Sequence, residues 1–248
     1  RHLRDALLHL SWHLPNLAWA IDAALLRNSP DDPGLITVLA RDLASHFHFT
    51  PLLLPAESAE QNLRWLQLLF ARHGLPLFLK RDNGAPFNEQ SLNDFLAQSA
   101  VIPLNSPIRC PSYNGAIENG VRAIKLPLLA DLDPTRHVAN QPALLPLLRA
   151  AVHLHNATPS PTLAGLSPIQ TYFRTSHHPW PRHRRLAIFQ WISAHAEATL
   201  HANRDDLHRH DPAAAWRQAV LRWLRCQHLI TVSHQPNVSP IFASLTRS

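Results

Sequence analysis

Cysteine and zinc-ligand patterns are scarce in this sequence, and their absence narrows the class of protein. Only two cysteines occur among 248 residues, Cys110 and Cys226, and neither belongs to a CxxC or His-Cys ligand pattern. This argues against a disulfide scaffold and against a structural zinc site. The 18 histidines include close pairs such as His153 and His155, but no second ligand pair stands at zinc-finger spacing. We therefore predict no zinc site and a reducing, cytoplasmic environment.

Targeting signals are also missing. No apolar run approaches the roughly 18 residues of a membrane span, and no charged start followed by an apolar stretch resembles a signal peptide. These two absences predict a soluble, unexported protein without a membrane partner. The sequence contains no Met and starts at Arg1, so we expect a fragment whose natural N-terminus lies upstream.

The composition is that of a globular protein with a polyanionic partner. The chain is 46% hydrophobic and 16% charged, which is enough for one sizeable core plus an accessory segment. Lys and Arg number 23 against 17 acids, for a net charge of +6 and a pI near 10.3. This balance favours a polyanion as partner. Charge alone does not distinguish DNA from RNA or from a membrane surface.

The order of apolar segments predicts an α/β domain with a mixed sheet. Three consecutive runs, LAWAIDAALL, LITVLAR and FHFTPLLL, are typical of strands, and the turn NSPDDPG joins the first two as a hairpin. Pro51 cannot donate to a ladder, so the third strand should lie at an edge of the sheet. The strands LPLFLK and VIPL follow, alternating with a buried helix over 56–73 and a helix that Asn88 caps.

The two ends of the chain are predicted to be mainly helical. Leucines at 3, 7, 10 and 14 have the spacing of a short amphipathic helix over 1–14. Further helices are expected over 113–126, 141–156, about 185–203 and 212–227. The segment HHPWPRHRR before the last two is a linker rich in Pro and His, and the final stretch HLITVSHQPNVSPIF is predicted to form a small hairpin.

Three acids lie where these elements could bring them together. Asp22 falls inside the first apolar strand, where an unpaired charge is costly unless it meets solvent, a partner or a cation. Asp82 follows a strand that could run parallel to the first, and acids at the carboxyl ends of adjacent strands meet at one edge. Glu118 lies on a helix that could pack across them. Converging carboxylates require a cation, and oxygen-only ligands favour Mg²⁺ or Mn²⁺.

Each of these residues also has a simpler explanation when taken alone. Asp82 precedes Asn83 and Gly84 and could only form a turn, and Glu118 could be an exposed helix acid. Arg122 and Lys125, at i+4 and i+7 from Glu118, could bind phosphates beside the acid or form a solvated face. Asn114 could shape an active-site loop or simply start the helix. For Asp42, at a predicted strand end, we expect a structural role.

Five blocks of the sequence match a known family in order: PNLAWAID, ITVLARDLASHF, HGLPLFLKRDNGAPF, SYNGAIENGVRAIK and HNATPSPTLAGLSPIQTYF. Together, over roughly residues 15 to 175, they resemble the DDE-type integrase catalytic core of bacterial insertion-sequence transposases and retroviral integrases. The most specific parts are the DNG(x)PF and NG(x)(x)E blocks. The chain departs from many relatives at Ala23 and Ala24, where Thr or an aromatic residue is common, and at Asn119, where Arg is common.

The resemblance implies an RNase H-like fold, with a five-stranded mixed sheet in the order 3-2-1-4-5 flanked by helices. It implies that Asp22, Asp82 and Glu118 are the catalytic residues and hold two Mg²⁺ or Mn²⁺ ions. It also implies that Lys125 contacts transposon-end DNA, with Arg122 on the same surface and Asn114 as a further DNA-binding candidate. The expected domains are an N-terminal helix or remnant of an upstream domain (1–14), the integrase core (15–175) and a linker with a mainly helical extension (176–248).

The function predicted on this basis is a DNA transposase or integrase, a polynucleotidyl transferase that processes 3′ ends and transfers strands of a mobile element. Its partners would be transposon ends and target DNA, bound by a homo-oligomer, in a bacterial cytoplasm in association with the nucleoid. Two alternatives remain open. One is a catalytically inactive, transposase-derived DNA-binding protein, and the other is an RNase H-like nuclease that cleaves without joining.

Overall fold

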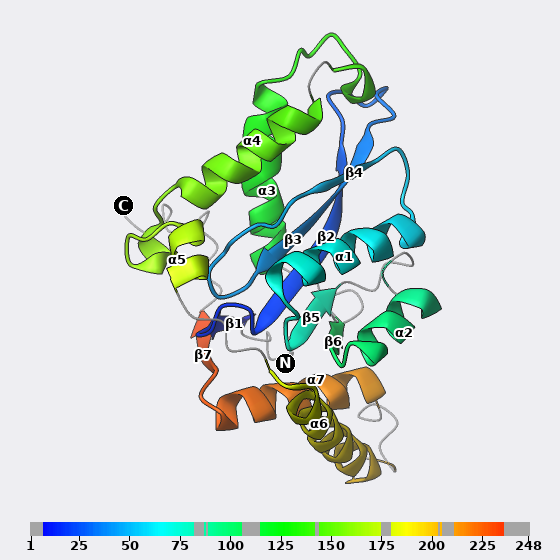
Figure 1. The fold of residues 1–248 in the computed structure, drawn as a ribbon, viewed down its shortest axis with the longest axis vertical. Helices are drawn as coiled ribbons and strands as arrows, with labels where there is room; N and C mark the ends of the chain where they lie inside the picture. Colours follow the sequence, from blue (N-terminus) through cyan, green and yellow to red (C-terminus); the bar gives the residue numbers. More distant parts are fainter. Residues whose placement is uncertain are drawn as a thin grey trace, which may run out of the picture.

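A computed structural model describes residues 7–81, 87, 89–105, 115–141, 144–174, 180–202, 204 and 211–235, with the side chains of all but 7–9, 115–118 and 234–235. Its strands are β1 Leu7–Trp12, β2 Ala18–Leu26, β3 Leu35–Asp42, β4 Leu52–Leu54, β5 Phe78–Arg81, β6 Ile102–Asn105 and β7 Ile230–Gln235 (Figure 1). Its α-helices are α1 Ala59–His73, α2 Gln90–Gln98, α3 Gly115–Ala130, α4 Leu144–Ala157, α5 Pro168–Arg174, α6 Arg182–Ala202 and α7 Pro212–Cys226.

Five strands form one mixed sheet in the order β4-β3-β2-β5-β6. The pairs β2–β3 and β3–β4 are antiparallel, whereas β2–β5 and β5–β6 are parallel. Counted from β2 as strand one, this order is 3-2-1-4-5, so the predicted fold class is confirmed. The edge position predicted for the third strand is also confirmed, because β4 begins directly after Pro51 and ends the sheet on that side.

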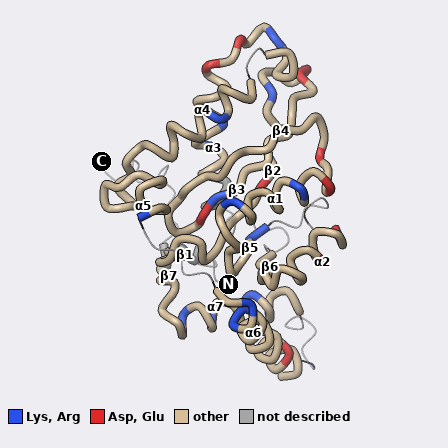
Figure 2. The backbone as a smooth tube through the Cα atoms, in the orientation of Figure 1, with Lys and Arg blue, Asp and Glu red and all other residues tan. Residues whose placement is uncertain are grey.

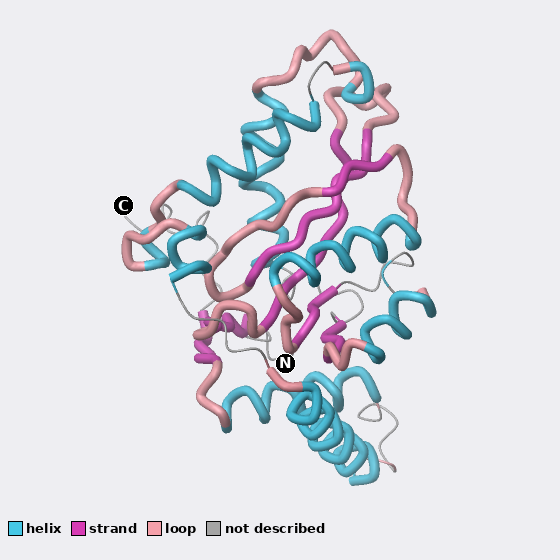
Figure 3. The backbone as a smooth tube through the Cα atoms, in the orientation of Figure 1, coloured by secondary structure: helices cyan, strands magenta, loops and turns pink. Residues whose placement is uncertain are grey.

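The two faces of the sheet are covered by different helices (Figures 1 and 3). Along β2, Trp19 and Ile21 point into a core that contains residues of α1 and α2, while Ala18 and Ala20 point into a core that contains residues of α3 and α4. This alternation follows from the two-residue period of a strand. Both faces of β2 are therefore buried over residues 18–21, and each face has its own set of partners.

Helix α1 shows how local sequence sets the limits of an element. The Ser58 side chain accepts a hydrogen bond from the Gln61 amide and so caps the first turn. Gly74 ends the helix with a φ of 83°, a conformation that glycine adopts without strain, and its amide donates to the Phe70 carbonyl. The helix predicted over 56–73 is thus confirmed, beginning at Ala59.

Helices α6 and α7 pack against the five-stranded sheet. Arg185 is buried, and its guanidinium donates to the carbonyls of Leu75, Pro76 and Trp180. The Trp216 indole donates to the Pro103 carbonyl of the edge strand β6 at 2.9 Å. The predicted helical extension is therefore present, and it covers one edge of the sheet.

The helix predicted over residues 1–14 is wrong for residues 7–12, which form strand β1. This strand pairs antiparallel with β7, from Leu7 opposite Gln235 to Trp12 opposite Ile230. The same segment also has apolar residues at every second position, namely Leu8, Leu10 and Trp12, and this alternation is typical of a strand. The partner strand, more than 200 residues away, decides between the two. The first arm of the predicted C-terminal hairpin, over 230–235, pairs with β1. The second arm of that hairpin lies outside the described residues.

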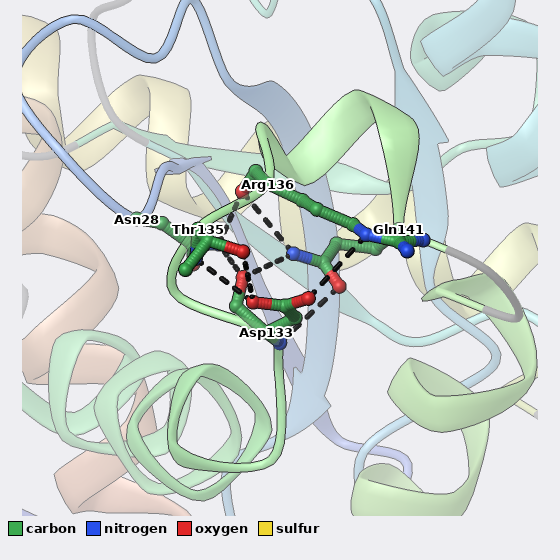
Figure 4. Close-up of polar contacts among 5 residues, drawn as sticks. All are labelled: Asn28, Asp133, Thr135, Arg136 and Gln141. Atoms are coloured by element: carbon green, nitrogen blue, oxygen red, sulfur yellow. Dashed lines mark hydrogen bonds and ion pairs between the residues drawn. The ribbon is translucent and has the colours of Figure 1, made fainter.

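The turn between β2 and β3 is tied to the segment that follows α3 (Figure 4). The Asn28 side chain donates to the carbonyls of Asp133 and Arg136 at 3.1 and 2.9 Å, and the Gln141 side chain donates through Nε2 to the same two carbonyls. Buried Asp32 accepts from the Val138 amide at 2.8 Å. These contacts fix the far end of α3 relative to β2.

None of the helices in the described part of the chain combines the length and apolar character needed to cross a membrane.

Candidate active site

Asp22 lies in the middle of β2, on the face of the sheet that α3 covers. Its neighbours at even positions, Ala20 and Ala24, belong to the core of that face, whereas Ile21 and Ala23 belong to the opposite one. Asp22 itself is half-buried, and its Oδ1 accepts a hydrogen bond from the Ala23 amide at 2.9 Å. The carboxylate therefore lies at the boundary between core and solvent, beside small side chains.

Strand β5 approaches β2 in parallel and ends beside this part of it. The paired positions are Ala18 with Phe78, Trp19 with Leu79 and Ala20 with Lys80. β5 ends at Arg81, and the predicted ligand Asp82 is the next residue in the sequence. Asp82 lies outside the described residues, so its predicted role stays a prediction.

Arg81 anchors the chain on both sides of the segment that contains Asp82. Its guanidinium donates to the Asn105 and Asn93 side-chain oxygens at 2.9 and 2.5 Å and to the Phe87 carbonyl at 2.5 Å. Burial lowers the pKa of Arg81 to about 10, so the group is still a cation at neutral pH. Arg81 thus joins the ends of β5 and β6, helix α2 and Phe87 at one point.

Helix α3 carries the third predicted ligand, Glu118, and runs in the same direction as β2. Near its start, Gly120 lies against Arg41, a β3 residue that pairs with Ala20 of β2. Further on, the Lys125 ammonium donates to the Leu25 carbonyl at 2.6 Å. Residue 118 is therefore in a helix that passes along β2, while the position of its side chain lies outside the described part.

Gly120 allows the close approach of α3 to the sheet. A Cβ atom at this position would lie 2.7 Å from His48 Nε2 and 3.0 Å from Arg41 Nη1. His48 is completely buried and held by Asn156 of α4, whose side chain bonds both the amide and the carbonyl of His48 at 2.9 and 2.8 Å. A side chain larger than hydrogen at 120 would move the helix away from β2.

The polar groups beneath α3 have strongly shifted pKa values. Burial, followed by the charge of Arg41 and the proximity of His155, holds the pKa of His48 well below its ordinary value. Burial also lowers the pKa of His155, and it lowers the pKa of Arg41 to about 10 despite the favourable charge of Asp42. At neutral pH this site therefore contains a cationic Arg41 beside neutral imidazoles.

The remaining candidates divide between exposed, half-buried and undescribed positions. Arg122 is exposed on α3, Lys125 is half-buried, and Asn114 lies outside the described residues. Within the described residues, no group of three His, Cys, Asp or Glu side chains could hold a metal ion. Two of the three predicted ligands, Asp82 and Glu118, have no described side chain, so this finding does not test the predicted triad.

Asp42 has the structural role expected for it. It is fully buried, and its carboxylate accepts hydrogen bonds from the Asn16 amide, the Ser45 amide and the Ser45 hydroxyl at 2.6–2.7 Å. These contacts stabilise the turn that follows β3.

Three positions that support the site were missed in the sequence. Arg81 and Gly120 stand directly beside recognised motifs, and Asn156 lies in the block HNATPSP, but nothing in their spacing indicates what they contact. The only available signal was their location inside blocks with a family pattern.

Comparisons with known proteins give a match in fold. No family model and no curated protein matches the sequence. A chain of the simian T-cell lymphotropic virus intasome, solved in complex with PP2A regulatory subunit B56 gamma, superposes with a TM-score of 0.56 at 18% identity. That match covers 69% of this chain and 59% of the other.

Two isolated catalytic cores also match. The BIV integrase core has a TM-score of 0.51 at 19% identity, over 64% of this chain and 95% of that one. The HTLV-2 integrase core, solved in complex with magnesium in a trimeric form, has a TM-score of 0.52 at 19% identity, over 64% and 97%. This chain therefore has the RNase H-like fold of retroviral integrase catalytic cores.

Proposed function

We propose that the protein is a DNA transposase or integrase that catalyses metal-dependent 3′-end processing and strand transfer of a mobile element. The observation that carries this proposal is the placement of Asp22. An acid lies half-buried on the α3 face of the central strand, beside a parallel strand that ends one residue before Asp82. The matching fold of integrase catalytic cores supports the same chemistry.

The strand register supports a shared role for Asp22 and Asp82. Ala20 pairs with Lys80 in a parallel ladder, and Asp22 and Asp82 each follow two residues later in the sequence. Glu118 belongs to the helix that covers this face. Three carboxylates are an oxygen-only donor set, which fits Mg²⁺ or Mn²⁺. Asp22, Asp82 and Glu118 would hold two such ions, which activate the attacking oxygen and stabilise the leaving one.

The chain's other residues would bind and orient the DNA. Arg122 is exposed on α3 and available to a phosphate, and Arg81 fixes both sides of the segment that follows β5. Water would first be directed at the donor strand to release a 3′-hydroxyl, and that hydroxyl would then attack a target phosphate in line. The core would span 15–175, with Asn114 and Lys125 as further candidates near the DNA.

Relatives support the proposed cofactor and assembly. The HTLV-2 core was solved with magnesium in trimeric and dimeric forms, and the simian virus protein was solved as an intasome. We infer that this chain uses Mg²⁺ or Mn²⁺ and acts as a homo-oligomer on paired DNA ends.

A joining assay tests the proposal directly. The protein is incubated with an oligonucleotide of the element's end, target plasmid and Mg²⁺ or Mn²⁺, and joined products are counted. We expect joining by the native protein and none by Asp82→Asn, with DNA binding retained. Binding without cleavage would indicate an inactive DNA-binding derivative, and cleavage without joining would indicate an RNase H-like nuclease. Near-normal joining by Asp82→Asn would overturn the assignment of the site.

A further inference from the structure

We propose that an exposed basic surface of helices α6 and α7, defined by Arg184, Arg222 and Arg225, binds the phosphate backbone of duplex DNA away from the candidate ligands. The inference takes its partner from the proposed function. Together α6 and α7 contain six arginines and one acid, Glu197 (Figure 2). Helices α1 and α2, by contrast, contain two arginines and two acids. Positive charge is therefore in clear excess on the pair α6 and α7.

Ring contacts show how the two helices lie against each other. Trp180, just before α6, has its ring centroid 6.1 Å from that of Trp223 near the end of α7. Further along α6, the Phe189 ring lies 5.4 Å from that of Trp216 near the start of α7. The helices therefore run antiparallel, and the first turn of α6 lies at the same end of the pair as the last turn of α7. The three arginines of the basic surface are gathered at this end.

The other three arginines of the pair have partners within the protein. Arg182 donates to the Gln98 carbonyl, and buried Arg185 donates to three further carbonyls. Half-buried Arg217 forms an ion pair with Asp211 at 3.7 Å. These arginines hold the helices on the sheet or stabilise the start of α7, so they are not part of the basic surface.

The basic surface itself lacks such partners. Arg184, Arg222 and Arg225 are exposed, and none of them forms an ion pair with another residue in the described part of the chain. Glu197 lies 13 residues after Arg184, about 20 Å further along the helix. At physiological salt this distance exceeds the Debye length of about 8 Å. The acid of α6 therefore does not neutralise the surface.

Helix stability does not account for these charges. Arg222 and Arg225 are three residues apart and so are neighbours on α7, whereas Val220 and Trp223 on the same helix are buried. A cation in the last turn of a helix is favourable, which would explain Arg225. Arg184, however, lies in the first turn of α6, where the helix dipole disfavours a positive charge. An anionic partner would offset this unfavourable charge.

The basic surface lies away from the candidate ligands. The Trp223 ring is 5.9 Å from the ring of Phe78, the first residue of β5. Phe78 pairs with Ala18, and Asp22 follows four residues later on β2, about 13 Å along the strand. DNA bound at both places would therefore contact the protein at separate points of one duplex. Contacts at the basic surface would raise affinity without taking part in the reaction.

Duplex DNA has the chemistry that this surface fits. Each strand carries a phosphate every 3.4 Å or so along the helix axis, so one duplex offers several phosphates to a group of arginines. The planar guanidinium donates two parallel hydrogen bonds to a phosphate. Such contacts orient the duplex but do not read its sequence. The surface is therefore expected to hold DNA of any sequence.

The experiment compares three substitutions in the full chain: Arg184→Gln, the double change Arg222→Gln with Arg225→Gln, and all three together. The matched control is Arg64→Gln with Arg72→Gln on α1, which removes two exposed positive charges from a helix outside the basic surface. Affinity is measured at several salt concentrations for a duplex of the element's end and for a duplex of unrelated sequence. Binding to anionic phospholipid vesicles, the joining rate at saturating DNA and thermal unfolding are measured in parallel.

We expect the salt slope of DNA binding to fall by about 1 for Arg184→Gln, about 2 for the α7 double variant and about 3 for the triple variant. The loss should be equal for the two duplexes, because phosphate contacts carry no sequence information. The joining rate at saturating DNA and the unfolding temperature should stay unchanged. The α1 control should keep the native slope although it loses the same charge as the α7 double variant.

Three results would overturn the inference. One is a native salt slope in the triple variant, and another is an equal loss in the α1 control, which would indicate a general effect of net charge. The third is reduced vesicle binding with unchanged DNA binding, which would assign the surface to a membrane. Failure of the proposed function is different, because the native protein would then bind DNA without joining it, and the salt slopes would still test the surface.

Discussion

The two faces of strand β2 differ in the size of their side chains. One face bears Trp19 and Ile21 and packs against large aromatic residues. The other bears Ala18, Ala20, Asp22 and Ala24 and faces α3. The large side chains fill space and hold the sheet in place, whereas the small ones let a helix approach and leave room for an acid. Because side chains alternate along a strand, β2 places its large packing residues on one face and the candidate ligand Asp22 on the other.

The aromatic face is packed ring against ring. Trp19 is fully buried, with its ring centroid 3.9 Å from that of Phe49 and 5.5 Å from that of Phe70. The α3 face contains polar groups instead, with Arg41 and His48 buried beneath Gly120. We therefore expect substitutions on the aromatic face to change stability, and substitutions on the α3 face to change activity at Asp22 and both stability and activity at the residues that support α3.

The largest effect should come from Asp22→Asn on the α3 face. Loss of the charged ligand should reduce the joining rate at least about 10⁴-fold, or more than 5 kcal/mol of activation free energy. Joining rates and thermal unfolding are measured together. An unfolding temperature close to that of the native protein is expected, because the group is half-buried beside solvent. A joining rate within tenfold of the native one would contradict the comparison.

Trp19→Ala, three positions earlier on the aromatic face, should have the opposite profile. Removal of a fully buried indole should lower the free energy of unfolding by about 3–5 kcal/mol. Urea unfolding followed by circular dichroism measures this loss. If the variant is too unstable to purify, Trp19→Phe, with a smaller loss, serves in its place. Unchanged stability in both variants would show that this face does not support the sheet.

Asn156→Ala removes the side chain that holds His48 beneath α3 and leaves the three candidate ligands unchanged. The amide and carbonyl of His48 would lose their buried partners, which should cost about 2–3 kcal/mol of unfolding free energy. His153→Ala on the exposed side of the same helix is the matched control and should change stability by less than about 0.5 kcal/mol. Equal losses of unfolding free energy in the two variants would contradict the hydrogen bonds between Asn156 and His48.

Gly120→Ala tests the close approach itself. Alanine favours a helix more than glycine does, by about 1 kcal/mol, but its Cβ would meet the His48 ring and the Arg41 guanidinium. We expect a net loss of about 1–2 kcal/mol in unfolding free energy and a lower joining rate, as α3 moves outward. A more stable variant with native activity would show that helix and sheet are not in tight contact.

The smallest effect is a dependence of stability on pH. His48 has a lowered pKa in the folded state, so the unfolded chain binds protons first as the pH falls below about 6.5. The contribution of neutral His48 is complete above that value and decreases below it. Between pH 7 and pH 6 the loss is roughly 0.7 kcal/mol.

Urea unfolding at several pH values measures this loss. Arg41, His46 and His155 also face His48 and add to its preference for the neutral form. His48→Gln should reduce the dependence, and what remains should include the contribution of His155, whose pKa is also lowered by burial. A native protein equally stable at both pH values would contradict a buried neutral His48.

Local signals in the sequence were sufficient for the strands and for one edge of the sheet, whereas the full strand order was predicted only from the family resemblance. Pro51 marked an edge strand, the turn before Gly34 marked a hairpin, and the acid within β2 stood out against its apolar neighbours. The ribbon of β1 and β7 could not be foreseen, because Leu8, Leu10 and Trp12 also fit a helix pattern and their partner lies at the other end of the chain.

The support beneath the site depends on contacts between distant segments. Nothing near Gly120 in the sequence indicates that His48 lies against it, and nothing near Lys125 indicates a bond to the carbonyl of Leu25. The resemblance named Lys125 for its charge, whereas its burial and its partner exist only in the folded chain. Sequence therefore gave the candidate ligands, and the structure gave the contacts that hold their elements together.

A metal site shared by three carboxylates is the central feature expected of this protein. Crystals of the protein grown with Mn²⁺ and measured at a wavelength where manganese scatters anomalously would locate the ions. We predict anomalous peaks within about 2.0–2.4 Å of carboxylate oxygens of Asp22, Asp82 and Glu118. Saturating Mn²⁺ with no peak at Asp22, or with the three carboxylates too far apart to share an ion, would contradict it.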